Sequence, residues 1–313
     1  MTIRKTLHQM MLFGIAATLL LGSGAVTRVQ AQAVDPALAE AYNAGLEAAT
    51  SGNYDLAKTK FEAALEIDPK YKDAHYNLGL VYQNLGQFGK AAEHFGKTLE
   101  LDPGNKNVLR LRADALLRGG QPKQAVGAYD KAIAADSTNV DLYFFAADAA
   151  SKAYPDPADL PKVIAAFQRA MNKAPKDGRT YSAAISLGTM CSRAEDYKGA
   201  LAAYEKASEL KPKEDTPHFN SAVVYQKMKK YQDAVKSLDQ ALALDPKNGK
   251  AHYMLAGIYY NQLKNDQLAL EHYDAAAADG SFKDRKKAKT NATTIREYLD
   301  KKKKQAEEAA GGQ

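Results

Sequence analysis

An aromatic residue recurs about every 34 positions along this chain, and this period constrains the fold more than any other feature. An alanine or valine stands four residues before each aromatic, and a small residue stands three residues after it. Self-similarity of this length is typical of a solenoid, in which each unit buries its apolar face against its neighbours. The aromatic column consists of Phe61, Phe95, Tyr129, Phe167, Tyr204 and Tyr273.

Each unit is predicted to be a pair of helices. In the second unit, apolar residues follow helical spacing over residues 73–85 and again over residues 90–101, with Gly86 between the two runs. Gly79 is small because the two helices must approach each other there, and Phe95 fills the space that it leaves. Pro103 cannot continue the second helix, so it sets the direction of the next unit.

These columns resemble the tetratricopeptide repeat, whose helix-turn-helix unit shows the same small, small, aromatic, small and proline order. The resemblance implies an all-α, right-handed superhelical solenoid of about seven helix-turn-helix repeats with a C-terminal capping helix. Members of the family are overwhelmingly binding scaffolds, so a non-enzymatic protein is expected. The predicted repeats lie near 38–71, 72–105, 106–139, 140–180, 181–214, 215–248 and 249–282 within an array over 34–282.

The fourth repeat departs from the regular period. Extra residues occur at Tyr154–Pro161, and Gly178–Thr180 are further additions before the fifth repeat. One interpretation is a loop insertion, which costs little closure entropy. The alternative is a change of superhelix path that divides the array into two arms.

The N-terminus predicts export. Arg4 and Lys5 precede an apolar run over residues 10–22, and small residues follow it. This order is typical of a secretory signal peptide over residues 1–33, with cleavage expected after Ala33 or, as second choice, after Ala31. The run is short for a membrane span, although an uncleaved anchor stays open as an alternative. No cysteine follows it, so a periplasmic or secreted protein rather than a lipoprotein is expected.

The net charge of +6 lies mainly at the two ends of the chain. The leader and residues 281–313 carry the excess of basic residues, so the repeats are nearly neutral and no basic face for nucleic acid is evident. Residues 283–300 carry one apolar stripe and are predicted to form the capping helix. Residues 301–313 are predicted to be a flexible tail, first basic and then acidic. The alternative for this tail is weak contact with anionic membrane or envelope polymer.

The residues that could carry chemistry mostly follow the repeat columns. Cys191 is the only cysteine, which excludes an intramolecular disulfide, and its column predicts a buried thiol. Histidines in one column of neighbouring repeats lie too far apart to bind one metal ion. No metal, no cofactor and no catalytic group are predicted.

The resemblance implies that the first helices line a concave groove. The positions predicted to contact a partner are Tyr42, Asn43, Tyr76, Asn77, Asn84, Arg110, Arg118, Phe144, Phe219, Asn220 and Tyr253, with Leu80, Asp114, Phe145, Asp148, Ile185, Arg193, Gln226, Tyr260 and Asn261 beside them. Aromatic rings supply contact area, and asparagine amides can pair with a peptide backbone. The alternative is that the aromatic residues simply pack between repeats.

We therefore expect a protein-interaction scaffold of the periplasm or cell envelope that binds a peptide or partner protein in its groove. The competing hypothesis is an envelope adaptor that attaches to membrane or wall polymer through its basic C-terminus. An enzyme is the weakest hypothesis, because it would need a catalytic group that the repeat columns do not explain.

Overall fold

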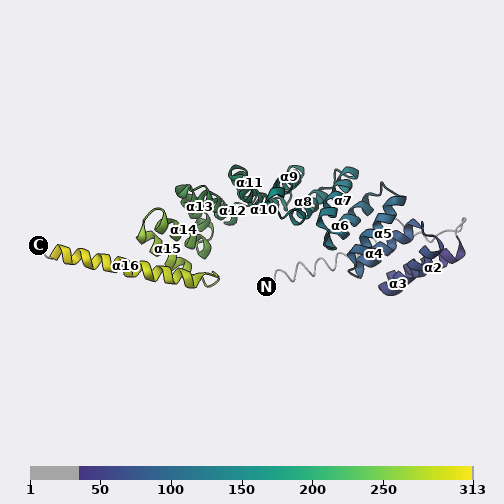
Figure 1. Ribbon diagram of the computed structural model, residues 1–313, viewed down its shortest axis with the longest axis horizontal. Helices are drawn as coiled ribbons and strands as arrows, with labels where there is room; N and C mark the ends of the chain where they lie inside the picture. Colours follow the sequence, from purple (N-terminus) through teal and green to yellow (C-terminus); the bar gives the residue numbers. More distant parts are fainter. Residues whose placement is uncertain (1–34, 312–313) are drawn as a thin grey trace. The chain divides into compact units, whose positions relative to one another are not determined.

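The computed structural model describes residues 35–311, and over this range it contains fifteen α-helices, one 3-10 turn and no strand (Figure 1). The predicted all-α fold is confirmed for this part of the chain. The predicted leader lies outside the described residues. None of the described helices is long and apolar enough to span a bilayer.

The helices divide between two compact units, one ending at Ala153 and the other beginning at Tyr154. This boundary falls at the extra residues of the fourth repeat. The helices of unit 1 are α2 (Pro36–Thr50), α3 (Tyr54–Ile67), α4 (Lys72–Asn84), α5 (Phe88–Leu101), α6 (Lys106–Arg118), α7 (Pro122–Ala135) and α8 (Val140–Ala153).

Unit 2 begins with the extra residues, which form a short loop and a 3-10 turn. Its elements are η1 (Pro157–Asp159), α9 (Leu160–Lys173), α10 (Thr180–Arg193), α11 (Tyr197–Leu210), α12 (Thr216–Lys227), α13 (Tyr231–Leu244), α14 (Gly249–Asn261), α15 (Asp266–Ala278) and α16 (Arg285–Gly311). In both units, consecutive helices pack against each other as hairpins.

The small residues of the first helices allow the close helix crossings that the sequence predicts. A Cβ atom added to Gly79 would lie 2.6 Å from the ring of Phe95, and one added to Gly188 would lie 2.5 Å from the ring of Tyr204. Phe95 is fully buried and Tyr204 is nearly so. The aromatic column therefore fills the space that the glycine column leaves.

The turns within the hairpins require a left-handed residue. Gly86 has φ of +71°, which lets the backbone N–H of Gln87 donate to the carbonyl oxygen of Tyr82 at 2.8 Å. In unit 2 the matching bond joins Lys230 to Tyr225 at 2.9 Å, but there the left-handed residue is Lys229, with φ of +58°. The same turn is thus built with glycine in one unit and with a bulkier residue in the other.

The last helix caps the array and is longer than predicted. Ala288, Ala292 and Ile295 are buried against Tyr273 of α15, as the apolar stripe predicts. The helix then continues to Gly311 through the residues assigned to a flexible tail, so that assignment is corrected. This stretch contains good helix formers and an ion pair between Lys303 and Glu307 at 3.9 Å.

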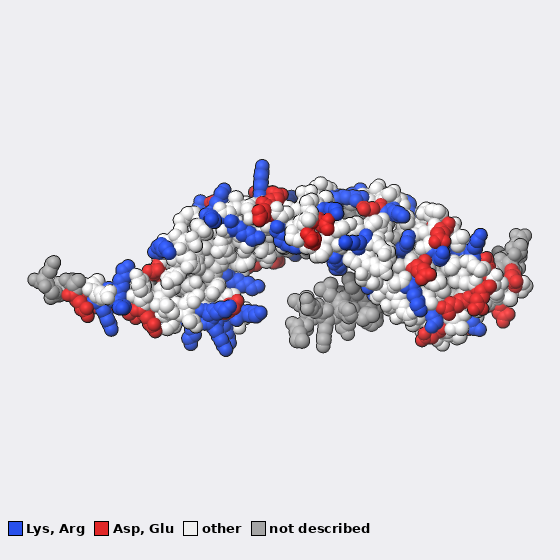
Figure 2. Space-filling model, in the orientation of Figure 1, with Lys and Arg blue, Asp and Glu red and all other residues white. Residues whose placement is uncertain are grey.

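Basic side chains gather around the start of α16 (Figure 2). They include Lys283, Arg285, Lys286, Lys287 and Lys289, all exposed. Their position at the positive end of the helix dipole does not stabilise the helix.

Candidate partner-binding site

A buried tyrosine joins the first two repeats of unit 1. Tyr42 of α2 packs against the ring of Phe61 at 5.6 Å and edge-on against Tyr71 at 5.0 Å. Its hydroxyl accepts a hydrogen bond from Asn77 Nδ2 of α4 at 2.8 Å. Tyr42 is only 6% exposed, so it packs between repeats, as the alternative interpretation predicts. Its hydroxyl also holds the Asn77 amide in a fixed orientation.

A second set of polar contacts joins repeats two and three. Asn107 Nδ2 at the start of α6 donates to the hydroxyl of Tyr76 on α4 at 3.3 Å, and Arg110 donates to Asn107 Oδ1 at 3.3 Å. Arg110 also donates to Asp114 at 2.9 Å, and the Tyr129 hydroxyl of α7 donates to the same carboxylate at 2.7 Å. We call Tyr76, Asn107, Arg110, Asp114 and Tyr129 the Arg110 network.

Burial sets the electrostatics of the Arg110 network. It raises the pKa of Asp114, while the Tyr129 hydroxyl and the charge of Arg110 oppose that shift. Burial also raises the pKa values of Tyr76 and Tyr129, so both phenols stay neutral near neutral pH. The network consequently holds one cation beside a partly buried carboxyl group.

The other predicted residues of unit 1 lie in varied surroundings. The side chain of Asn84 donates to the carbonyl oxygen of Leu80 in its own helix at 2.9 Å, and Arg118 lies over the ring of Phe88 at 4.1 Å. Asn43 is half-buried, and its Oδ1 atom is buried without a hydrogen-bond partner. Phe144 is half-buried. Of these residues, Arg118 acts on the Arg110 network through its charge, which also opposes the raised pKa of Asp114.

Phe145 extends the Arg110 network with apolar surface. Its side chain is 39% exposed, and its ring lies 6.2 Å from the ring of Tyr129. Phe145 thus adds exposed aromatic surface next to Tyr129, whose hydroxyl donates to the carboxylate that holds Arg110.

In unit 2 the predicted aromatic residues pack into the repeats. Phe219 is half-buried against an apolar cluster of α12, α13 and α14. Tyr253 packs against the rings of Tyr273 at 5.4 Å and Phe282 at 5.5 Å. Asn220 is half-buried, whereas Tyr260 is 42% exposed. The structure thus places Phe219 and Tyr253 largely in packing positions.

Sequence reasoning missed Asn107 and Tyr129 as members of a polar network. A signal for Tyr129 exists in the repeat, because Asp114 stands 15 positions before it. The same spacing joins Thr189 to the hydroxyl of Tyr204 at 3.3 Å. Where the aromatic residue is Phe95, the matching position holds Leu80. In repeats three and five, a tyrosine in the aromatic column therefore goes with a polar residue on the first helix, whereas Tyr273 of repeat seven has Ile258 at this spacing.

The single thiol is structural. Cys191 is buried, as its column predicts, and burial, with a further contribution from Asp196, raises its pKa to about 11. A thiol with a raised pKa is a poor nucleophile at neutral pH. Among the described residues, no group of three or more His, Cys, Asp or Glu side chains could hold a metal ion.

Models of known protein families match four stretches of the repeat array. Models described as tetratricopeptide repeat match residues 73–105, 181–214 and 219–283, and a model described as TPR repeat matches residues 45–86. Together these matches cover about half of the chain. No curated protein matches the sequence significantly.

Several solved structures are similar to this chain. The crystal structure of YrrB, described as a TPR protein with an unusual peptide-binding site, is 20% identical, with a TM-score of 0.47 over 61% of this chain and 95% of its own. MamA from Desulfovibrio magneticus is 17% identical, with a TM-score of 0.47 over 57% of this chain and 97% of its own. A tetratricopeptide repeat protein from Parabacteroides merdae is 14% identical, with a TM-score of 0.45 over 84% of this chain and 100% of its own.

Proposed function

The chain belongs to the tetratricopeptide repeat family, and from this premise we propose that it is a non-enzymatic scaffold that binds an extended peptide segment of a partner protein on the first helices of unit 1. The surface we propose consists of the Arg110 network together with Asn77 and Phe145.

The observation that carries this proposal is the fixed position of Arg110. A guanidinium group has five N–H donors, and Asp114 and Asn107 hold it in place from two sides. Its side chain is 35% exposed. A donor group that is already ordered loses little entropy when a ligand binds, so it contributes more to affinity than a free surface arginine.

The chemistry of this surface suits backbone carbonyl groups and carboxylates of the partner. Arg110 presents donors in a planar fork. Asn77 adds its Oδ1 acceptor, because its Nδ2 group already donates to Tyr42 and to the carbonyl oxygen of Asp73. Phe145 supplies apolar contact area beside them. A peptide with an acidic side chain flanked by an apolar one would satisfy both parts of the surface.

We test this proposal with Arg110→Ala combined with Phe145→Ala. The matched control is Gln226→Ala combined with Tyr260→Ala, which removes exposed side chains from first helices of unit 2. Crosslinking in intact cells followed by mass spectrometry identifies the partner, and titration with the purified partner measures affinity. We expect the unit 1 variant to weaken binding at least about 30-fold with unchanged helicity, as loss of a hot spot of about 2 kcal/mol does. Equal affinities for the two variants would refute the proposal.

We also propose that the protein is exported to the periplasm or cell envelope. Its support is the charged, apolar and small-residue order of residues 1–33. Cell fractionation that recovers the full-length chain only in the cytoplasm would rule export out.

The free end of α16 favours a second candidate function. Lys301, Lys302, Lys303 and Lys304 are all exposed on a helix that continues beyond the apolar stripe. In an envelope adaptor these residues would contact anionic membrane or wall polymer, with about 1 kcal/mol for each basic residue near the surface. Deleting residues 301–313 distinguishes the two functions, because it abolishes attachment to anionic vesicles in the adaptor and leaves peptide binding intact in the scaffold.

A further inference from the structure

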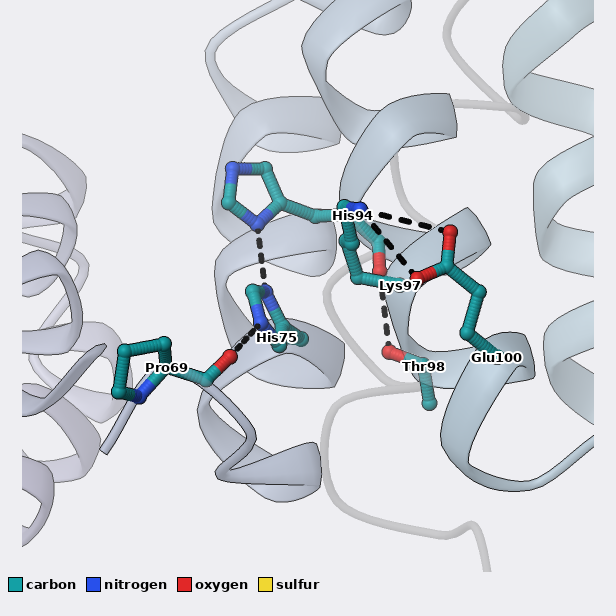
Figure 3. Close-up of polar contacts among 6 residues, drawn as sticks. All are labelled: Pro69, His75, His94, Lys97, Thr98 and Glu100. Carbon is teal, nitrogen blue, oxygen red and sulfur yellow. Dashed lines mark hydrogen bonds and ion pairs between the residues drawn. The ribbon is translucent and has the colours of Figure 1, made fainter.

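Two histidine pairs with the same geometry occur in the chain, one in each unit. In repeat two, His75 Nδ1 of α4 lies 3.1 Å from His94 Nδ1 of α5 (Figure 3). In repeat seven, His252 Nδ1 of α14 lies 3.0 Å from His272 Nδ1 of α15. Each pair therefore joins the two helices of one hairpin.

Each pair is also anchored to the preceding repeat. His75 Nε2 lies 3.0 Å from the carbonyl oxygen of Pro69, in the turn that precedes α4 (Figure 3). His252 Nε2 lies 3.1 Å from the carbonyl oxygen of Pro246 in the equivalent turn. The contacts thus run from a proline turn, through the first helix, to the second helix.

These contacts determine where the protons lie. A carbonyl oxygen only accepts, so His75 Nε2 must carry a hydrogen and donate it to Pro69. In the neutral imidazole, His75 Nδ1 is then the acceptor, and His94 Nδ1–H must donate to it. The same reasoning makes His272 the donor to His252. Both pairs require one defined tautomer of each ring.

The surroundings of the outer histidines, which are His94 and His272 on the second helices, disfavour a positive charge. Burial, followed by the neighbouring His75, lowers the pKa of His94; Lys90 on its own helix adds to this shift, and Glu93 and Glu62 oppose it. The ring of His94 also stacks on Tyr82 of α4 at 5.4 Å.

In repeat seven, burial, followed by the neighbouring His252, lowers the pKa of His272, and Glu271 opposes that shift. His272 stacks on Tyr259 of α14 at 5.7 Å. The two outer histidines thus share the direction of the shift, its two main causes and an aromatic neighbour on the first helix.

One proton can be added to each pair without breaking it, but a second cannot. The first proton on His94 enters at Nε2 and leaves the Nδ1–H donor in place. The second must enter at His75 Nδ1, where it faces the hydrogen of His94 between two cationic rings. Such strongly coupled groups titrate as a pair. The pair supplies only two nitrogen ligands, which does not make a metal site.

We infer that the two histidine pairs are acid-sensitive links between the two helices of repeats two and seven. Each link is intact near neutral pH and breaks when both rings become cationic. Release of a pair would remove the polar link from the second helix to the first helix and the preceding proline turn, while Phe95 or Tyr273 stays packed in the hairpin. This property is independent of the peptide-binding surface of unit 1.

The direction of the pH dependence follows from the lowered pKa values of His94 and His272. Below the ordinary histidine pKa of about 6.5, the unfolded chain binds more protons than the folded one. The stabilisation is therefore present above about pH 6.5 and is lost as the pH falls below that value.

The chain contains internal controls that lack a pair. Repeat six has His218 in the first-helix column, but the position that matches His94 is Ser237. In the turn before repeat four, Ser137 replaces the proline, and the equivalent bond comes from the hydroxyl of Tyr143, which donates to the Ser137 carbonyl oxygen at 3.1 Å. A phenol does not titrate in this range, and repeat six has no second histidine facing His218, so neither repeat should show the response that a histidine pair predicts.

Hydrogen exchange of the full chain, compared at about pH 7.5 and about pH 5 after correction for intrinsic rates, tests the inference. On acidification we expect protection of α4–α5 and α14–α15 to fall about tenfold relative to α12–α13. In His94→Gln, which cannot become cationic at this position, the response should disappear from α4–α5 and persist in α14–α15. A response in α4–α5 that is the same in the variant, or an equal response in α12–α13, would overturn the inference.

A second measurement needs no variant, so it does not depend on whether a variant folds. Nitrogen-15 spectra of the imidazoles in the unmodified protein report the tautomers directly. We expect Nδ1–H at His94 and His272, and Nε2–H at His75 and His252, near neutral pH. The opposite tautomer at His94 and His272 would remove the hydrogen bond on which the inference depends.

Discussion

Unit 1 and unit 2 use the same repeat but differ in their turns and in their first-helix surfaces. Both units pack a large ring under a glycine, as Phe95 does under Gly79 and Tyr204 does under Gly188. In unit 1 the left-handed turn residues are glycines, whereas in unit 2 they are Glu195, Lys229 and Lys264. The packing columns recur in both units, so they account for the fold and leave the surfaces free to differ.

The surfaces differ in what holds their side chains. In unit 1, Arg110 is held by Asp114 and Asn107 of its own helix, and Asn107 in turn donates to Tyr76 of the preceding repeat. In unit 2, Tyr253 of the corresponding column packs against Tyr273 and Phe282. The difference indicates that family membership explains the hairpins, and that a specific function has to be sought in residues that vary between them.

The largest expected effect tests whether the two units share one packing rule. Phe95→Ala and Tyr204→Ala should each lower the free energy of unfolding by about 3–5 kcal/mol, because each leaves a cavity beneath a glycine. Urea unfolding followed by circular dichroism measures the loss. Leu101→Ala is the control, since Leu101 is 41% exposed. A loss below about 1 kcal/mol in only one of the two units would show that the packing is not shared.

The next effect tests the polar network that distinguishes unit 1. Tyr129→Phe should cost about 1–3 kcal/mol, because it removes a hydrogen bond from the partly buried Asp114 carboxylate. Adding Asp114→Leu recreates the pairing of Leu80 with Phe95 and should restore stability to within about 1 kcal/mol of the original protein. If the double variant is less stable than Tyr129→Phe alone, the two residues do not act as a pair.

The double variant also separates stability from binding. It should stay folded while Arg110 loses its anchor, so affinity for the partner should fall although the repeat is intact. The matched change in unit 2 is Tyr204→Phe, which loses only a 3.3 Å contact with Thr189 and should leave partner affinity unchanged.

A smaller effect tests the turns. Gly86→Lys should destabilise unit 1 by about 1–2 kcal/mol, because a side chain is unfavourable in the left-handed region. Lys229→Gly should stabilise unit 2 by a smaller amount, since glycine loses more backbone entropy on folding. Urea midpoints of the two variants check the signs. Two shifts in the same direction would contradict this account of the turns.

The smallest effect concerns the end of α16. Deleting residues after Asp300 should change the free energy of unfolding by less than about 0.5 kcal/mol, because Lys301–Lys304 make little buried contact. Ile295→Ala, on the same helix, should cost about 2–5 kcal/mol because Ile295 is 3% exposed. Thermal unfolding of the two variants checks the contrast, and similar losses would show that the free end also packs.

The packing of this chain could be predicted because it depends on residue types that recur at one spacing. Gly79, Phe95 and the apolar stripe of Ala288, Ala292 and Ile295 all lie where their columns place them. The extent of α16 was missed because the prediction stopped at the last apolar residue, whereas helix-forming polar residues continue the helix without burial.

The polar contacts were missed for a different reason. Each column was compared with itself in neighbouring repeats, where side chains lie about one helix spacing apart. The pairs His75–His94 and Asp114–Tyr129 instead join two columns within one hairpin, at separations of 19 and 15 residues. Which polar residues meet across a hairpin depends on side-chain direction, which the period alone does not give.

The central claim is that the first helices of unit 1 hold the partner. A photo-crosslinking amino acid placed at Phe145, and in a second variant at the exposed Gly127 of the second helix α7, tests this claim in intact cells. We predict one defined partner crosslinked from position 145, with the yield reduced by Arg110→Ala, and none of it crosslinked from position 127. Equal capture of the same partner from both positions, or a yield at position 145 that does not depend on Arg110, would contradict the claim.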